Sequence, residues 1–227
     1  MTMCGRFSLA YEDWGEMLNY WGVVNTDFAQ GPRYNVAPGQ DISAVIDSPS
    51  GHRIGRLRWG LVPSFAVNSK PAIQSINARL ETVLQKPMFK RLVARRRCVI
   101  PADGFFEWKR SGANKQPYRI VIDERPFFGF AGLYDTWTRP DGTRVSTCLI
   151  LTTKANEMMA EIHDRMPLIL TEEAEKIWLD SGISDGEFVC SSLDPYPARH
   201  MRAYPVSSLV GNVRNDSKAC IEPLQVF

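Results

Sequence analysis

The sequence predicts a single α+β domain over residues 1–227, in which short helices flank a largely antiparallel, barrel-like β-sheet. Three observations support this fold class. Predicted strands outnumber predicted helices, several strands follow one another through short polar turns, and no linker, repeat or low-complexity tract divides the chain. With 44% hydrophobic and 23% charged residues, the composition is that of an ordinary globular protein.

The first part of the chain predicts one helix and then two strands between loops. Apolar residues recur at spacings of three and four over residues 11–21, which favours an amphipathic helix. Residues 42–46 and 53–59 predict two strands joined by a polar turn. Segments 33–39 and 60–65 contain Pro and Gly and predict loops, the second of them unusually apolar.

The middle of the chain predicts two helices and then paired strands. A helix is predicted over residues 77–84, and Pro87 suits the first turn of the next helix. Residues 118–122 predict a strand that pairs back onto the segment 98–108 across a polar connection. The aromatic segment 127–137 is punctuated by Gly, which is typical of a bent strand in a barrel or sandwich.

The last third of the chain predicts a hairpin, two helices and a short strand. Asp141-Gly142 predicts the hairpin turn. A short helix is predicted from about Asn156, a strand over residues 166–170, and a further helix whose N-cap is Thr171.

The net charge of +2 argues neither for nor against a nucleic-acid partner. The distribution of charge is more informative, because the segment 86–97 carries six basic residues and no acid. Such a run fits either a solvated helix face or a ridge that faces phosphates.

Cysteine usage and hydropathy indicate a cytoplasmic protein without a metal site. The five cysteines are an odd number, are widely spaced and form no CxxC or CxxH pattern, which argues against a disulfide framework and a zinc site. No stretch of about 18 apolar residues predicts a membrane helix, and the first twenty residues do not resemble a secretory signal. We therefore expect a reducing compartment and no membrane partner.

The segment Met3-Cys4-Gly5-Arg6-Phe7 is an unusual opening with a specific chemical potential. If Met3 is removed, or translation starts there, Cys4 carries a free α-amine and a thiol on adjacent carbons. The amine can condense with an aldehyde to an imine, and the thiol can then close onto the imine carbon to give a thiazolidine. The alternative is that Cys4 is a small buried hydrophobe at the start of a strand.

Four further residues could carry chemistry, and each also has a structural interpretation. His163 lies in a dense polar segment and could act as a general acid or base, or could cap a helix end. Glu107 lies between aromatic residues, so that it is either desolvated with a raised pKa or, by strand alternation, exposed. Asn77 and Arg79 could orient a nucleophile or hold a phosphate, although Asn is also a common N-cap.

Three apolar residues could contact unpaired bases. Pro38, Phe65 and Trp108 could stack on bases or wedge between them, as aromatic platforms do in proteins that bind single-stranded DNA. Apolar residues of loops more often cover the edge of a core.

All of these residues except Phe65 belong to seven blocks that closely resemble the SRAP family, the SOS-response-associated peptidases. The blocks run in order over almost the whole chain, and the NAR, FFEW and IHDRMP blocks in that order are very specific. They begin at Met3, Arg33, Arg58, Asn77, Ala102, Ile162 and Tyr204.

The resemblance implies a sensor of abasic sites in single-stranded DNA that forms a covalent thiazolidine with the ring-opened sugar and so shields the lesion. Cys4 would supply the amine and the thiol, and His163 would help to open the sugar to its aldehyde. Glu107 would carry protons during imine formation and reversal. Asn77 would orient Cys4 or the sugar.

The resemblance also implies a set of DNA contacts and no metal or organic cofactor. Arginines would hold the phosphates on either side of the lesion, and other residues would line the channel. The predicted phosphate contacts are Arg6, Arg79 and Arg165, and the predicted channel residues are Asn35, Pro38, Phe65 and Trp108. We expect a monomer that is cytoplasmic and associates with the nucleoid when it is bound to DNA.

Two departures from the family pattern leave alternatives open. Three residues precede Cys4 where the family has only the initiator methionine, so the true start is Met3 or the Met-Thr-Met leader is removed. Phe65 and Ala66 lie where family members often carry Trp, which would weaken stacking. The alternative functions are a cysteine peptidase limited to removing its own leader, with Cys4 and His163 as nucleophile and base, and a DNA-binding module without chemistry.

Overall fold

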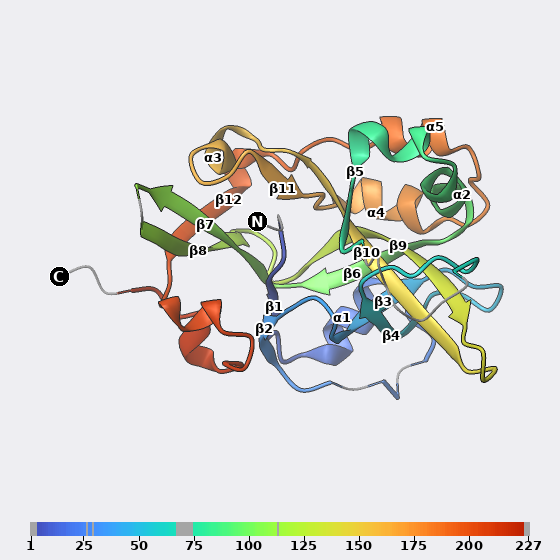
Figure 1. Ribbon diagram of the computed structural model, residues 1–227, viewed down its shortest axis with the longest axis horizontal. Helices are drawn as coiled ribbons and strands as arrows, with labels where there is room; N and C mark the ends of the chain where they lie inside the picture. Colours follow the sequence, from blue (N-terminus) through green and yellow to red (C-terminus); the bar gives the residue numbers. More distant parts are fainter. Residues whose placement is uncertain (1–3, 26, 29, 67–74, 113, 225–227) are drawn as a thin grey trace.

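Two β-sheets share one aromatic core in the computed structural model, which describes residues 4–25, 27–28, 30–66, 75–112 and 114–224 (Figure 1). The smaller sheet is antiparallel throughout. Its strands, in spatial order, are β12 (Met201–Pro205), β8 (Asn114–Ile122), β7 (Gly104–Ser111), β1 (Phe7–Leu9) and β2 (Arg33–Val36).

The larger sheet closes into a five-stranded barrel, which confirms the predicted fold class. The ring closes because β9 (Phe128–Thr138) pairs with β10 (Arg144–Lys154) on one side and with β6 (Arg97–Ala102) on the other. Its strands are β10 (Arg144–Lys154), β4 (Arg53–Trp59), β3 (Asp41–Ile46), β6 (Arg97–Ala102) and β9 (Phe128–Thr138). All pairs in the ring are antiparallel except that between β10 and β4.

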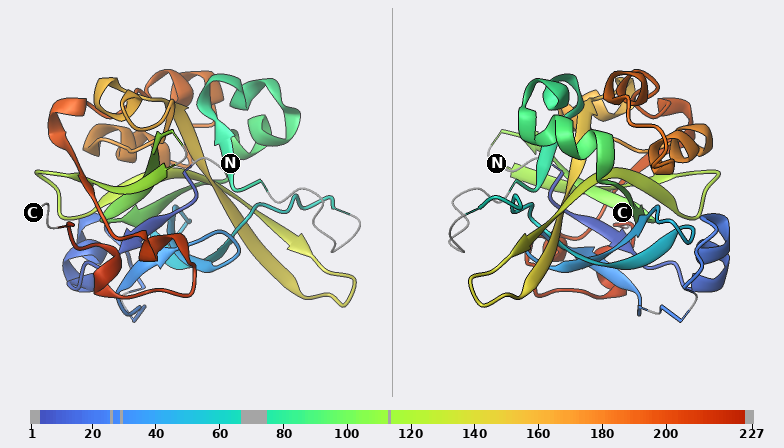
Figure 2. Two further views of the ribbon diagram at one scale, coloured as in Figure 1. Left: turned by 60° about the vertical axis from the view of Figure 1, so that its left-hand side comes forward. Right: turned by 90° about the vertical axis from the view of Figure 1, so that its right-hand side faces the viewer.

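Strand β10 is long enough to leave the barrel and to organise a second group of short strands. Its first part pairs with β9, and the two form the hairpin that projects from the barrel in Figure 2. Its last part lies between β5 (Asn77–Arg79), which is parallel to it, and β11 (Arg165–Pro167), which is antiparallel. Predicted site residues from two distant parts of the sequence therefore flank one strand.

Short helices cover the barrel on two sides. Helices α2, α4 and α5 gather on one side in Figures 1 and 2, and α1 lies on the opposite side. The α-helices are α1 (Trp14–Tyr20), α2 (Pro87–Arg95), α3 (Glu157–Ala160), α4 (Glu172–Leu179) and α5 (Gly186–Ser191). The 3-10 helices are η1 (Leu80–Gln85), η2 (Ala198–His200), η3 (Ser208–Gly211) and η4 (Lys218–Cys220).

Aromatic contacts join the two sheets. The ring of Phe7 on β1 lies 5.4 Å from that of Trp59 and 5.8 Å from that of Phe130, both on the barrel. Phe105 on β7 also packs against Phe130, with ring centroids 6.2 Å apart. Because such pairs add about 1 kcal/mol each to the burial of apolar area, they fix how the smaller sheet sits on the barrel.

Several local predictions were confirmed and others were wrong. Pro87 begins α2, and the Thr171 side chain caps α4 as predicted. The predicted helix at 77–84 is instead strand β5 followed by η1, because pairing with β10 overrides local propensity. The start of the predicted loop at 33–39 is strand β2, and the first helix begins at Trp14 rather than at residue 11.

The basic run at 86–97 is only partly a solvated face. Arg97 is buried and donates to backbone carbonyls of Val93 and Trp178. Arg91 pairs with the buried carboxylate of Asp135 at 2.7 Å. Two of the six basic residues, Arg91 and Arg97, therefore hold helices against the barrel, whereas Lys86, Lys90, Arg95 and Arg96 are exposed.

Two features are absent from the part of the chain that the structure describes. No helix there is long and apolar enough to cross a membrane. No three His, Cys, Asp or Glu side chains gather there in an arrangement that could hold a metal ion.

Candidate active site

Cys4 and Glu107 are in direct contact, although 103 positions separate them in the sequence. The backbone N–H of Cys4 donates to Oε1 of Glu107 at 2.7 Å, and both residues are 4% exposed. The register explains the contact, since antiparallel pairing of Phe7 with Phe105 brings the residues before β1 alongside the later residues of β7. Cys4 has a φ of +47°, a left-handed conformation that few non-glycine residues adopt.

The exposed position expected for Glu107 from strand alternation was wrong. Alternation itself holds, since Phe106 and Trp108 lie on one face of β7 and pack in a small second cluster with C-terminal residues. Phe105 and Glu107 lie on the other face, and Phe105 there belongs to the main core. Both faces of β7 are covered, so Glu107 is desolvated whichever way the alternation runs.

Burial dominates the electrostatics of this pair. It raises the pKa of Glu107 above its ordinary value, and the hydrogen bonds from Cys4 and the charge of His163 only partly offset the rise. Burial also raises the pKa of the Cys4 thiol well above its usual value, and the neighbouring Glu107 adds to this effect. The thiol is therefore protonated near neutral pH, and Glu107 is suited to hold a proton.

His163 lies in a loop that starts from a capped helix. The side chain of Asn156 caps α3, and the His163 backbone N–H then donates to the carbonyl of Met159 at 2.8 Å. Nδ1 of His163 accepts from the backbone N–H of Arg165 at 3.1 Å and lies 2.9 Å from a carboxylate oxygen of Asp164. The amide contact suits an unprotonated Nδ1 and the carboxylate contact a protonated one, so together they fix the position of the ring and not its tautomer.

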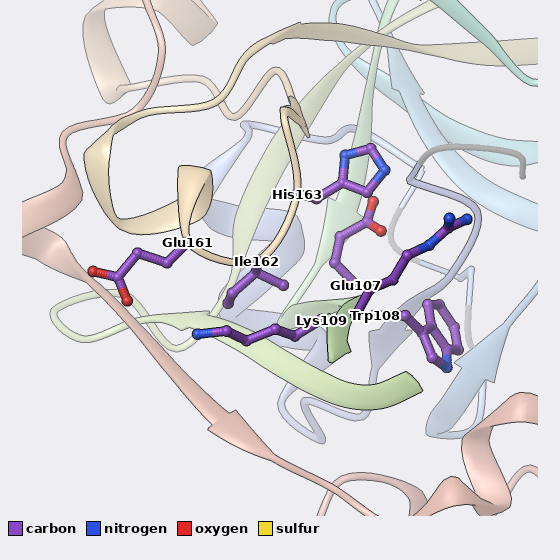
Figure 3. A pocket seen from close by; sticks show the side chains of 7 residues that line it. Glu107, Trp108, Lys109, Glu161, Ile162 and His163 are labelled. Carbon is purple, nitrogen blue, oxygen red and sulfur yellow. The ribbon is translucent and has the colours of Figure 1, made fainter. Parts of the chain in front are cut away.

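Glu107 and His163 face each other across a cavity of about 270 Å³. Figure 3 shows the Glu107 carboxylate directed toward the His163 ring, whereas the side chains of Lys109 and Glu161 extend away from them. The cavity is lined by Glu107, Trp108, Lys109, Arg110, Glu161, Ile162 and His163. A carboxyl group and an imidazole thus meet at one cavity, and the carboxyl group also accepts the hydrogen bond from the buried Cys4.

Arg165 is buried and already engaged, although it was predicted to hold a phosphate. Its NH1 and NH2 groups bond the two carboxylate oxygens of Glu81 at 2.7 and 3.0 Å. NH2 also donates to the carbonyl and the hydroxyl of Thr152 on β10. Its charge acts on Cys4, where it opposes the rise in the thiol pKa.

Arg6 and Asn35 hold the C-terminal segment in place, and Asn35 is fully buried rather than open to a channel. The Arg6 guanidinium donates to Oδ1 of Asn35 at 2.9 Å and to the carbonyls of Val210 and Gly211. The Asn35 side-chain amide donates to three backbone carbonyls, at residues 210, 212 and 215. In this arrangement both residues support the segment that covers Phe106.

The other predicted DNA contacts are accessible. Phe65 is 67% exposed at the tip of a turn, and Pro38 and Arg79 are also exposed. Trp108 is half-buried at the rim of the cavity. Asn77 is half-buried at the start of β5, opposite Ile150 of β10.

Comparison with known proteins identifies the family of this chain. The sequence model of the SOS response associated peptidase (SRAP) family matches residues 3–213. The chain belongs to the SRAP family. It is 45% identical over 223 residues to the abasic site processing protein YoqW of Bacillus subtilis, covering 97% of this chain and 99% of that protein.

More distant SRAP relatives match over the same length. The abasic site processing protein YedK of Escherichia coli is 35% identical over 230 residues, which covers 98% of this chain and all of YedK. A crystal structure of a protein from Bacteroides thetaiotaomicron superposes with a TM-score of 0.85 at 29% identity, covering 98% of this chain and all of the other. The family resemblance of the seven sequence blocks is thus confirmed, and the fold is that of this SRAP-like structure.

Sequence reasoning missed two acids of this site. Glu81 holds Arg165, and Asp164 lies beside Nδ1 of His163. Both are in blocks that carry the family resemblance, which was the available signal. Their partners could not be predicted, because the contact between Glu81 and Arg165 depends on both flanking β10.

Proposed function

We propose that this protein recognises abasic sites in single-stranded DNA and links to them covalently through a thiazolidine at Cys4. The observation that carries the proposal is that the Cys4 nitrogen is held 2.7 Å from a buried carboxyl group, with its thiol on the same residue. The printed names of YoqW and YedK, abasic site processing proteins, support the choice of substrate.

The reaction needs a free α-amine on Cys4, and therefore removal of residues 1–3 or a start at Met3. The amine attacks C1′ of the ring-opened deoxyribose, and loss of one water gives an imine. The thiol then adds to the imine carbon as its proton passes to the nitrogen, which closes the ring. The adduct has the mass of the two partners less one water.

The proposed roles follow from the state of each group. Glu107, with a raised pKa, donates the proton that removes the hydroxyl group as water and takes it back on reversal. His163 lines the cavity beside Glu107 and assists opening of the sugar. Since the Cys4 thiol is protonated at rest, the amine reacts first and the thiol second. Asn77 would orient Cys4 or the sugar.

The proposed path of the DNA uses the accessible residues. Phe65 and Pro38 would stack on or separate bases, Trp108 would contact the sugar at the rim of the cavity, and Arg79 would hold a phosphate. Arg6 would reach a phosphate from the edge of the C-terminal segment. We further propose that the protein acts as a monomer in the cytoplasm, and at the nucleoid when bound.

The test compares Cys4→Ala with the wild-type chain, both beginning at residue 4. Wild type should give a denaturant-stable product with an abasic oligonucleotide. Cys4→Ala retains an amine but no thiol, so it should bind the DNA and form a product only when borohydride reduces the imine. A stable product from Cys4→Ala without reductant would show that another residue makes the link.

A second candidate activity is removal of the leader by the same site. It is favoured by the hydrogen bond from the Cys4 peptide nitrogen to Glu107 and by the left-handed backbone at Cys4. The full chain should then lose residues 1–3, whereas Glu107→Ala and His163→Ala should retain them, as read by intact mass. Normal processing in both variants would exclude self-cleavage by this site.

A further inference from the structure

The end of the β7–β8 hairpin is a basic ribbon with no other strand beside it. Pairing of β7 with β1 stops at Phe105, and pairing of β8 with β12 begins only at Tyr118. In the described part of the chain, residues 109–111 and 114–116 therefore pair as strands only with each other. Over residues 108–122 the sequence has four basic residues and no acid.

Three of these four cations lie at the free end of the hairpin. Arg119 is buried and pairs with Asp103, whereas Arg110 and Lys115 are exposed and stand directly opposite each other in the register. Like charges in opposite positions of an antiparallel pair repel and destabilise it. The ion pairs within the described chain include neither Lys109 nor Lys115. A charge arrangement that weakens the hairpin points to a partner that supplies negative charge.

This basic end borders the cavity of the candidate active site. Lys109 and Arg110 line the cavity together with Glu107 and His163. Because Lys109 lies two residues beyond Glu107 on the same face of β7, about 7 Å separates their backbones. A phosphate next to a sugar at Glu107 would thus lie within reach of Lys109. The other acid that lines the cavity, Glu161, is exposed on the side of the His163 loop.

The hairpin extends away from the elements that carry the other proposed DNA contacts. Phe65 lies on the loop held by β9, and Arg79 lies on β5. In Figure 1, β5 and β9 lie on one side of β1, whereas the β7–β8 hairpin extends on the other. An abasic site within a strand has a phosphate on either side of it. One flank would therefore run toward β5, and the other across the hairpin.

We propose that Lys109, Arg110 and Lys115 bind the phosphates of the DNA strand on one side of the abasic site, where this flank leaves the cavity over the β7–β8 hairpin. The inference rests on the proposed function. These contacts hold the strand without reading its sequence, since they go to phosphates and not to bases.

The experiment measures the rate of crosslinking at low DNA concentration by chains that begin at Cys4. Two abasic oligonucleotides are compared, which have nucleotides only on the 5′ side or only on the 3′ side of the lesion, and the crosslink fixes which flank each presents. In Lys109→Gln and in Lys115→Gln the rate should fall by about two- to fivefold with one oligonucleotide and change little with the other. With the first, the slope of log rate against log salt concentration should become shallower by about 0.7 in each variant.

The control is Lys176→Gln, which removes the same charge from α4, a helix that carries none of the proposed DNA contacts. It should react like wild type with both oligonucleotides. Thermal melting should show Lys115→Gln to be at least as stable as wild type, because a repelling pair is removed. Equal losses with the two oligonucleotides, no loss with either, or an equal loss in the control would each overturn the role of the hairpin. Failure of wild type to crosslink an oligonucleotide with both flanks would instead contradict the proposed function.

Discussion

At the scale of single residues, the chemistry depends on how little water reaches Cys4 and Glu107. The sequence indicated Cys4, Glu107 and His163 as candidates, and the structure places Glu107 beside each of the other two, but the sequence could not give their environment. Strand alternation says which residues share a face, and only the second sheet and the C-terminal segment decide that both faces of β7 are covered. The raised pKa of Glu107 follows from that covering rather than from its neighbours in sequence.

Glu107→Gln should remove the group that transfers the proton in the reaction and should raise the free energy of unfolding. Gln keeps an acceptor for the Cys4 N–H, and the rate of crosslinking should fall by at least about 10²-fold. Since burial raises the pKa of Glu107 in the folded state, the folded protein binds more protons than the unfolded chain between the two pKa values, and wild-type stability falls as pH rises through that window. Gln does not titrate, so the stability of Glu107→Gln does not fall in this way as pH rises.

Urea unfolding at about pH 4 and about pH 8 measures the effect. The free energy of unfolding of Glu107→Gln relative to wild type should be higher at the upper pH than at the lower. An equal difference in the free energy of unfolding at both pH values would mean that burial does not raise the pKa of Glu107.

At the scale of elements, long-range pairing decides what local sequence left open. The segment 77–84 has the pattern of a helix, but its first three residues form β5 because β10 offers an unpaired edge beyond the barrel. The opposite edge of β10 receives β11, so Glu81 and Arg165 meet across β10. No property of either segment alone predicts that meeting.

Asn35→Ala should destabilise the protein by about 3 kcal/mol, because three backbone carbonyls at 210, 212 and 215 would each lose a buried donor. The C-terminal segment would loosen over Phe106. Equilibrium unfolding in urea measures the cost. Ser191→Ala is the control, since its hydroxyl bonds a carbonyl of its own exposed turn and should change stability by less than about 0.5 kcal/mol.

At the scale of the whole molecule, the closed barrel was predicted in kind but not in its strand order. Turn patterns in the sequence predicted that β3 pairs with β4 and β9 with β10. The barrel closes because β6 also pairs with both β3 and β9, which the sequence did not indicate. The barrel also carries the loop that presents Phe65, since Asp135 and Trp137 of β9 bond the backbone of Ser64 and Ala66. The exposed ring of Phe65 is thus carried by a loop that β9 holds in place.

Phe65→Ala should weaken binding of single-stranded DNA by about 1–3 kcal/mol, the contribution of one stacked base. Fluorescence anisotropy with an undamaged oligonucleotide measures it without the covalent step. Phe188→Ala is the matched control, because Phe188 is 52% exposed on α5, which carries none of the predicted contacts. Equal losses in the two variants would remove Phe65 from the DNA-binding surface.

The central claim is the covalent bond at Cys4, and intact mass of the protein tests it most directly. A chain that begins at Cys4 is incubated with an abasic single-stranded oligonucleotide and weighed under denaturing conditions. The account predicts a new species whose mass is that of the protein plus the oligonucleotide less one water. A chain that begins at Cys4, binds the oligonucleotide and keeps its own mass would contradict the account.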